Sequence, residues 1–284
     1  MQQVVNVKCP YCESQAFVYK ICDMEMFLCH ACQRDSNYEK VKSYGNTIKP
    51  SNNDRSSGTS IRSSLDYNAV LRHCKSLDSL PSSHHCIEYV RNRGIPSSLY
   101  VDLFWTDNFR EIGLQTGNQL SKRDKSERLV IPIRDDKGAL YGVQGRALDD
   151  NELRYITLYF NDKERLYGMN KVDMTKPFNV VEGPIDSFFV NNCVALCGTN
   201  NLDDKYSTLA TVILDNEPRN KQIVEKISKY IDRQFKVVIW PDHLKQKDIN
   251  EMYLAGIDTN TVISNNTYNG ITAKIRMNAW KKIK

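Results

Sequence analysis

The sequence predicts a multi-domain α/β protein, and three observations support this prediction. Two Cys-x-x-Cys pairs lie near the N-terminus, a polar stretch rich in Ser and Asn follows them, and the last hundred residues alternate strand-like and helix-like segments. The chain has 284 residues, which is more than the ~250 residues at which single cores usually stop growing. We therefore expect a small β head, an α+β middle part and a parallel α/β sheet, in this order.

The N-terminal cysteines have the spacing of a structural metal site. The first pair is Cys9 and Cys12, and sixteen residues separate it from the second pair, Cys29 and Cys32. Two such turns can point four thiolates at one tetrahedral Zn²⁺ ion. Paired disulfides are the alternative interpretation, which a reducing compartment disfavours. We predict a zinc ribbon over residues 1–35 that unfolds without Zn²⁺, because so small a core is not stable by burial alone.

A predicted linker separates the head from the middle part. Residues 36–64 are polar and rich in Ser, Asn, Gly and Lys, so they bury too little apolar surface to fold alone and are expected to be flexible. The middle part then covers residues 65–175. Its first 29 residues carry apolar residues at helical spacing that Pro81 interrupts, which predicts two short helices.

A β-hairpin is predicted later in the middle part. An apolar run begins at Leu129, the turn residues Asp135 to Gly138 follow, and a second apolar run leads to Arg146. Two strand-like runs joined by a short Asp- and Gly-containing turn are typical of a hairpin.

Residues 176–260 are predicted to form parallel βαβ units, because strand-like and helix-like segments alternate there. The expected strands are 179–181, 193–196, 211–214 and 236–240, and the expected helices are 185–191, 220–234 and 248–254. The helix at 220–234 is amphipathic and should lie against the sheet.

Four acidic residues follow three of these strands. Glu182 follows the first strand, Asp215 and Glu217 follow the third, and Asp242 follows the fourth. Because the carboxyl ends of parallel strands lie along one edge of a sheet, these side chains should converge. Clustered carboxylates repel one another unless a cation neutralises them, which favours Mg²⁺ or Mn²⁺. The alternative for any single acid is a surface charge or a helix cap.

The net charge of +5 is unevenly distributed along the chain. No acidic residue follows Asp258, and residues 261–284 contain five basic ones. Such a basic C-terminal segment could track a phosphate backbone or could be a solvated helix end. The start of the chain does not resemble a signal peptide, and no run of ~18 apolar residues occurs, so we expect a soluble intracellular protein without membrane contact.

Two segments resemble the Toprim domain that primases, topoisomerases and some nucleases share. They are residues 178–186, Phe-Asn-Val-Val-Glu-Gly-Pro-Ile-Asp, and residues 212–217, Val-Ile-Leu-Asp-Asn-Glu. With the cysteine pairs and the hairpin ahead of them, the order of parts resembles that of DnaG-type DNA primases, most closely bacteriophage primase subunits. The resemblance spans nearly the whole chain. It implies an N-terminal zinc ribbon, an α+β RNA-polymerase core and a Toprim α/β parallel sheet.

The resemblance also implies which residues act. Glu182, Asp215 and Glu217 would be catalytic and would bind Mg²⁺, with Asp242 or Asp248 as a further ligand. The acid pair departs from the Asp-x-Asp of many relatives, because this chain has Asp215-Asn216-Glu217. Contacts to nucleic acid or nucleotide are expected from four basic residues, Arg128, Arg146, Lys163 and Arg165.

The implied function is synthesis of short RNA primers on single-stranded DNA during phage DNA replication, by a nucleotidyltransferase that depends on divalent metal. Its cofactors would be structural Zn²⁺ and catalytic Mg²⁺ or Mn²⁺. Its partners would be the single-stranded template, ribonucleoside triphosphates and a replicative helicase, in the host cytoplasm. A Toprim nuclease, a recombination-mediator DNA-binding protein and a zinc-ribbon accessory protein are the alternatives.

Overall fold

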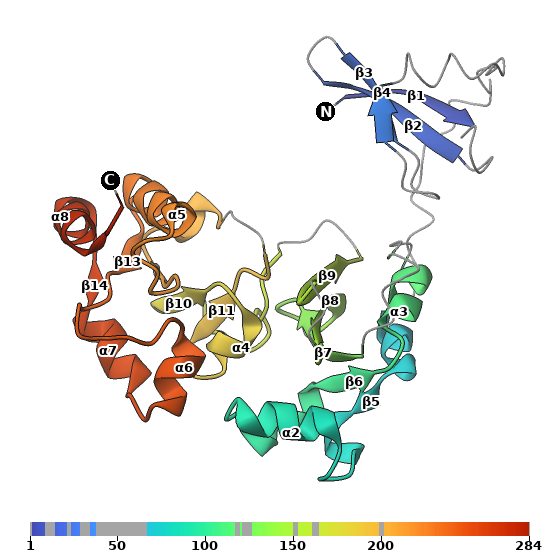
Figure 1. The fold of residues 1–284 in the computed structure, drawn as a ribbon. Helices are drawn as coiled ribbons and strands as arrows, with labels where there is room; N and C mark the ends of the chain where they lie inside the picture. Colours follow the sequence, from blue (N-terminus) through green and yellow to red (C-terminus); the bar gives the residue numbers. More distant parts are fainter. Residues whose placement is uncertain are drawn as a thin grey trace. The chain divides into compact units, whose positions relative to one another are not determined.

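The computed structural model describes residues 67–283, apart from short gaps at 117–119, 121–126, 150–152, 161–164 and 199–201, together with the backbone of four strands in the first 66 residues. The chain divides into two compact units. The first comprises residues 1–66 and 113–124, and the second comprises residues 67–112 and 125–284. Figure 1 shows the elements of both units.

The first unit contains an antiparallel sheet. Its strands are β1 (Gln2–Lys8), β2 (Gln15–Ile21), β3 (Met24–Leu28) and β4 (Asp35–Asn37), and they pair in chain order. The predicted β head is therefore present. Its four candidate zinc ligands, Cys9, Cys12, Cys29 and Cys32, lie outside the described residues, and so does the segment at 38–66.

An antiparallel sheet also begins the second unit. Its strands are β5 (Lys75–Ser76), β6 (Phe104–Thr106), β7 (Arg128–Arg134), β8 (Leu140–Ala147) and β9 (Tyr155–Tyr159), in the order β5-β6-β7-β8-β9. β7 and β8 form the predicted hairpin. Asp135 Oδ1 closes its turn by accepting hydrogen bonds from the N–H groups of Lys137 and Ala139, while Gly138 takes a φ of +80°.

Short helices surround this sheet. They are η1 (Tyr67–His73), η2 (Leu77–Ser79), α2 (His85–Asn92), η3 (Ser97–Asp102) and α3 (Phe109–Gln115). The two short helices expected before residue 93 correspond to η1 and α2. Proline interrupts them as expected, because Pro81 begins the turn that leads into α2.

The second sheet of this unit is mainly parallel. Its strands are β10 (Phe178–Val181), β11 (Cys193–Ala195), β12 (Ala210–Val212), β13 (Lys236–Val238) and β14 (Thr267–Tyr268), in the order β11-β10-β12-β13-β14. The first four are mutually parallel and β14 is antiparallel to β13. The four predicted parallel strands are therefore present.

Helices cover both faces of the parallel sheet (Figure 1). They are α4 (Pro184–Ser187), η4 (Asp204–Tyr206), α5 (Lys221–Asp232), α6 (Ile249–Leu254), α7 (Thr259–Asn265) and α8 (Gly270–Trp280). From β10 the chain runs outward to β11, and from β12 it runs the other way to β13. Since βαβ crossovers are right-handed, this reversal puts α4 and α5 on opposite faces. The edge between β10 and β12 is thus a topological switch point.

The core of the second unit is continuous between its two sheets. Buried side chains extend from Leu77 in the first sheet's helices to Trp280 at the end of α8. α5 contributes the predicted apolar face, since Ile223, Val224, Ile227, Tyr230 and Ile231 are all buried. Among the described helices, none has the length and apolar content needed to cross a membrane.

Candidate active site

Four carboxylates meet at the switch point of the parallel sheet. Glu182 follows β10, Asp186 lies in α4, Asp215 follows β12 and Asp248 precedes α6. All four line one cavity of about 480 Å³. The sequence therefore folds three separated segments so that their acidic side chains share a single space.

The turn after β10 explains why Glu182 and Asp186 lie close together. Gly183 caps α4 from an extended conformation, and Pro184 occupies the first turn, where a missing N–H costs nothing. A Cβ atom at Gly183 would lie only 3.3 Å from Oδ2 of Asp186. Glycine thus leaves room for the Asp186 carboxylate beside the strand end.

The cluster is electrostatically strained. Burial, followed by the charges of Asp248 and Asp215, raises the pKa of Asp186 to about 7. Burial, followed by the charges of Glu182 and Asp248, raises the pKa of Asp215 to about 7. Burial and the neighbouring carboxylates therefore both disfavour the ionised forms of Asp186 and Asp215. A cation would relieve this strain.

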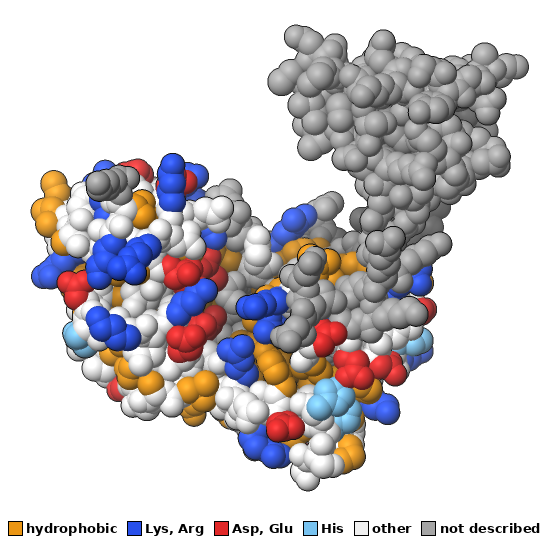
Figure 2. All heavy atoms as spheres, viewed as in Figure 1, with side chains coloured by type: hydrophobic (Ala, Val, Ile, Leu, Met, Phe, Trp, Pro, Cys, Tyr) orange, Lys and Arg blue, Asp and Glu red, His pale blue; other side chains and the backbone are white. Residues whose placement is uncertain are grey.

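Two lysines neutralise part of the charge. Lys226 of α5 places Nζ 2.7 Å from Oε1 of Glu182, and Lys247 places Nζ 3.4 Å from Oε1 of Glu217 and 4.0 Å from Oδ2 of Asp215. Figure 2 shows acidic and basic side chains gathered side by side on one face of the second unit. In the part of the chain that the structure describes, no three His, Cys, Asp or Glu side chains are drawn close enough to enclose an ion. The donors are nonetheless all carboxylate oxygens, the ligands that Mg²⁺ prefers, so the residues fit this ion.

The predicted acids separate into two groups. Glu182 and Asp215 share the cavity, together with Asp248. Glu217 turns toward a neighbouring hollow, where its Oε2 accepts a hydrogen bond from Asn220. Asp242 lines that same hollow with a side chain that is 80% exposed, and its Oδ1 lies 3.9 Å from Nζ of Lys282. The structure therefore does not bring Asp242 to Glu182 and Asp215.

Basic and polar side chains from the antiparallel sheet, and one from the end of α2, line the same cavity. They are Arg93, Gln144, Arg146, Arg154, Tyr155 and Thr157. Arg146 lies between two aromatic rings, with its guanidinium carbon 4.7 Å from the centroid of Tyr155 and 5.9 Å from that of Tyr89. Its Nε also donates to the Tyr89 hydroxyl. These contacts hold a cation in place near the carboxylates.

The other predicted basic residues have different positions. Arg128 is fully buried and donates to the carbonyl oxygens of Gly145 and Leu153, which makes it part of the sheet's core. Arg165 packs over the ring of Tyr159. Neither belongs to the residues that line the cavity. Lys163 lies outside the described residues.

Several cavity residues had no predicted role, among them Asp186, Arg93 and Arg154. Asp186 lies four residues after Glu182, on the first turn of a helix, and this position is a usable signal. Arg93 and Arg154 lie just after α2 and just before β9. Nothing in their local sequence distinguishes them from solvated arginines.

The sequence is similar to known DNA primases. The DNA primase of Enterobacteria phage T4 is 33% identical over 221 residues, which cover 74% of this chain and 64% of that protein. The DNA primase of Borreliella burgdorferi is 33% identical over 116 residues, covering 37% of this chain and 19% of that protein. The chain is a homologue of these DNA primases. It spans less than two thirds of the length of these relatives, and no family model matches it.

Solved primase structures share this homologue's fold. The crystal structure of the Aquifex aeolicus primase, with zinc-binding and RNA polymerase domains, matches at a TM-score of 0.51 and 19% identity, covering 98% of this chain and 80% of that one. A DnaG primase catalytic domain bound to single-stranded DNA matches at a TM-score of 0.52 and 17% identity, covering 75% of this chain and 77% of that one. The primase resemblance read from the sequence is thereby confirmed.

Proposed function

We propose that this chain is a DNA primase that synthesises short RNA primers on single-stranded DNA during phage DNA replication, in the host cytoplasm. The observation that carries the proposal is a single cavity with four carboxylates on one wall and three arginines on the other. Joining nucleoside triphosphates uses both, because the carboxylates would hold the divalent cations that the transfer needs and the arginines would neutralise charge on the phosphates.

The carboxylate wall would hold Mg²⁺ or Mn²⁺. Glu182, Asp186, Asp215 and Asp248 are the candidate ligands, whereas Glu217 and Asp242 line the neighbouring hollow. Such an ion supplies activation of the attacking 3′-hydroxyl and neutralisation of charge on the transferred phosphoryl group. Glu182 is also the candidate general base, and Nζ of Lys226 lies 2.7 Å from its Oε1.

The arginine wall would bind the triphosphate and the template. Arg146 and Arg154 line the cavity from the antiparallel sheet and its edge, and Arg93 lines it from the end of α2. Guanidinium groups suit phosphate because their planar forks donate two parallel hydrogen bonds. Arg128 and Arg165 support this wall through their packing on the sheet, and Lys163 remains a candidate contact.

The remaining parts of the proposal follow the family likeness. The parallel sheet would be a Toprim domain, as its Glu-Gly turn and its Asp-Asn-Glu segment suggest. The N-terminal sheet would be a zinc ribbon whose four cysteines hold structural Zn²⁺ and that grips the single strand. Ribonucleoside triphosphates and a replicative helicase would be further partners.

Primer synthesis tests the proposal directly. The protein is incubated with single-stranded template, Mg²⁺ and labelled ribonucleotides, and short oligoribonucleotides are resolved on a gel. We expect products from the wild type and a loss on the order of a hundredfold for Glu182→Gln, because a charge at the reacting centre is removed. Glu225→Gln on the exposed side of α5 is the matched control and should retain activity.

Other outcomes decide between the alternatives. Template cleavage that needs Mg²⁺ but no nucleotides would show that the protein is a nuclease and not a primase. Template binding without primer products and without cleavage would indicate a recombination mediator or an accessory protein.

A further inference from the structure

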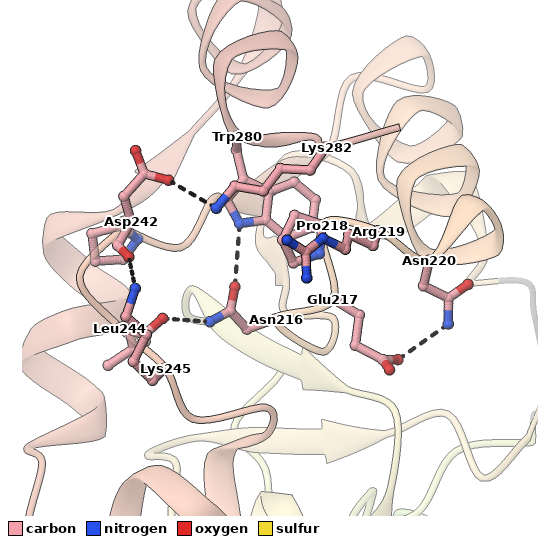
Figure 3. Close-up of a pocket in the computed structure, with 11 residues that line it drawn as sticks. Asn216, Glu217, Pro218, Arg219, Asn220, Asp242, Leu244, Lys245, Trp280 and Lys282 are labelled. Carbon is pink, nitrogen blue, oxygen red and sulfur yellow. Dashed lines mark hydrogen bonds and ion pairs between the residues drawn. The ribbon is translucent and has the colours of Figure 1, made fainter. Parts of the chain in front are cut away.

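A second cavity, of about 420 Å³, lies beside the acid pair, and its basic residues have no role in the proposed reaction. Figure 3 shows how its lining comes from the loop after β12, the segment after β13 and the end of α8. The loop after β12 supplies Glu217 and Arg219, the segment supplies Asp242 and Lys245, and the helix end supplies Trp280.

The walls of this cavity are held by specific hydrogen bonds. Asn216 Nδ2 donates to the carbonyl oxygen of Leu244, and Trp280 Nε1 donates to Asn216 Oδ1 at 3.2 Å (Figure 3). Asn216 Nδ2 also donates to the carbonyl oxygen of Gln246. The backbone N–H of Lys282 donates to the carbonyl of Pro218 at 2.8 Å. Three segments that are distant in sequence are therefore tied together around one hollow.

The acidic side chain of Glu217 in this cavity already has partners, whereas the basic side chains have few. Glu217 is engaged by Asn220 and by Lys247, which does not line the cavity. Lys245 Nζ donates to a neutral acceptor, the carbonyl oxygen of Asp242. Arg219 forms no hydrogen bond or ion pair with any residue that the structure describes.

Lys282 adds a third cation at the rim. Its Nζ lies 3.9 Å from Asp242 Oδ1, which is a loose contact between exposed side chains. Such pairs contribute little energy in water, so a ligand of higher charge would displace the carboxylate. Three basic side chains are therefore available to one ligand.

We propose that this cavity binds a phosphate group, carried either by the backbone of a nucleic acid or by a nucleotide. Arg219 provides a two-pronged donor, and Lys245 and Lys282 provide mobile point charges around it. Asn216 lies between Asp215 and Glu217, so the bound phosphate would be anchored next to the candidate active site. The proposal goes beyond primer synthesis, because it concerns a site that the reaction itself does not use.

Binding measurements on the full chain test this site. The variant Arg219→Gln/Lys282→Gln removes two charges at exposed positions, and Lys229→Gln/Arg276→Gln removes two charges from exposed positions that line neither cavity. Fluorescein-labelled oligothymidylate is followed by anisotropy over a range of NaCl concentrations, and ATP by titration calorimetry. Both are measured without added divalent metal.

The two probes distinguish the source of the phosphate. If it is a nucleic-acid backbone, the Arg219/Lys282 variant binds the oligonucleotide more weakly, and its slope of log K against log salt falls by about 0.7 for each lost contact. If it is a nucleotide, ATP binding weakens instead. Equal behaviour of both double variants toward both probes would overturn the proposal.

Failure here is separable from failure of the primase proposal. Primer synthesis is assayed on the same protein preparations. The binding experiments contain no added metal and involve no incorporation of nucleotides. A wild type that makes primers while both variants bind alike would reject the phosphate cavity alone.

Discussion

Asp215, like Asp186, is a residue at which burial and neighbouring charge oppose ionisation. Its pKa rises from 3.8 to about 7 in the folded chain. A folded-state pKa above the unfolded value means that the native state binds more protons in this interval, so stability falls as pH rises through it. The contribution of Asp215 to the free energy of unfolding is fully present below pH 3.8, the unfolded pKa, and it is lost as the pH rises through the folded pKa of about 7.

This shift predicts a pH-dependent difference between two proteins. Without Mg²⁺, the unfolding free energy of the wild type should decline relative to that of Asp215→Asn between about pH 5 and about pH 8. Added Mg²⁺ should stabilise the wild type at the higher pH and the variant less. Urea unfolding at each pH measures both effects, and parallel pH profiles for the two proteins would contradict the prediction.

Asn250 links the arginine wall to the carboxylate wall. It is 1% exposed, accepts from Arg93 Nη1 at 3.0 Å, donates from Nδ2 to the carbonyl of Arg93 at 2.7 Å, and donates from its backbone N–H to Asp186. One side chain thus satisfies two groups of Arg93 that would otherwise be poorly paired.

Asn250→Ala should therefore destabilise the protein by about 1–3 kcal/mol, the usual cost of leaving a buried polar group unpaired. Primer synthesis should fall as well, because Arg93 loses its support. The matched control is Asn260→Ala, whose Oδ1 accepts from Asn191 N in an exposed bond. An equal loss of stability in both variants, measured in urea, would remove the special role of Asn250.

The acids of the site show what strand position predicts and what it does not. Glu182 and Asp215 leave adjacent parallel strands, so their convergence follows from topology alone. Asp242 leaves a third parallel strand, yet it is largely exposed at the other hollow. Asp248, six residues later at the start of α6, reaches the cavity instead. The path of the 241–248 segment depends on tertiary packing that local sequence does not encode.

At the scale of elements, long apolar runs in the sequence predicted where the strands lie better than they predicted how long the strands are. The expected strands at 211–214 and 236–240 are observed as β12 and β13, which end two residues earlier. The apolar residues beyond them remain buried but bond elsewhere, as Ile239 N donates to Asn266 and Trp240 Nε1 donates to Leu214. The apolar runs therefore stay buried beyond the point at which the strands stop pairing with their neighbours.

The elements after residue 258 were harder to predict. α8 buries Ala273, Met277 and Trp280, but it also exposes Ile271 and Ile275, so the contrast between its faces is weak. β14 has only two residues, too few for a period to be visible. The basic residues there left a phosphate contact and a solvated helix end open, and their sequence did not indicate that the segment completes a sheet and packs on α5.

α8 should therefore matter for stability through its last turn. Trp280 is 5% exposed and bonds Asn216, so Trp280→Ala should cost about 3–5 kcal/mol. Ile271→Ala, at a side chain that is 77% exposed, should change stability by less than about 0.5 kcal/mol. Thermal unfolding of both variants measures the difference. Similar losses would mean that α8 is not anchored by its buried face.

At the scale of the molecule, the candidate site needs two sheets. The carboxylates leave a parallel sheet, whereas Arg146 and Arg154 belong to the antiparallel sheet and its edge. Sequence patterns can place each sheet but not the contact between them, since that contact depends on side chains scattered from Leu77 to Trp280 in one core. This is why the acids were found and most of the arginine wall was not.

The two compact units should also respond differently to loss of zinc. The four cysteines belong to the first unit, and the continuous core with both cavities belongs to the second. If Zn²⁺ holds the N-terminal sheet, Cys29→Ser/Cys32→Ser should lower bound zinc from one ion per chain to none, because a tetrahedral site needs all four ligands. Folding of the small sheet depends on that energy, so its unfolding transition should disappear.

The second unit should unfold at the same temperature in this variant and in the wild type. Elemental analysis gives the zinc content, and calorimetry resolves the transitions. Cys74→Ser/Cys193→Ser, which alters two cysteines of the second unit, is the control and should keep its zinc. A fall in the transition temperature of the second unit after zinc loss would show that the units fold as one, and an unchanged zinc content would exclude these cysteines as ligands.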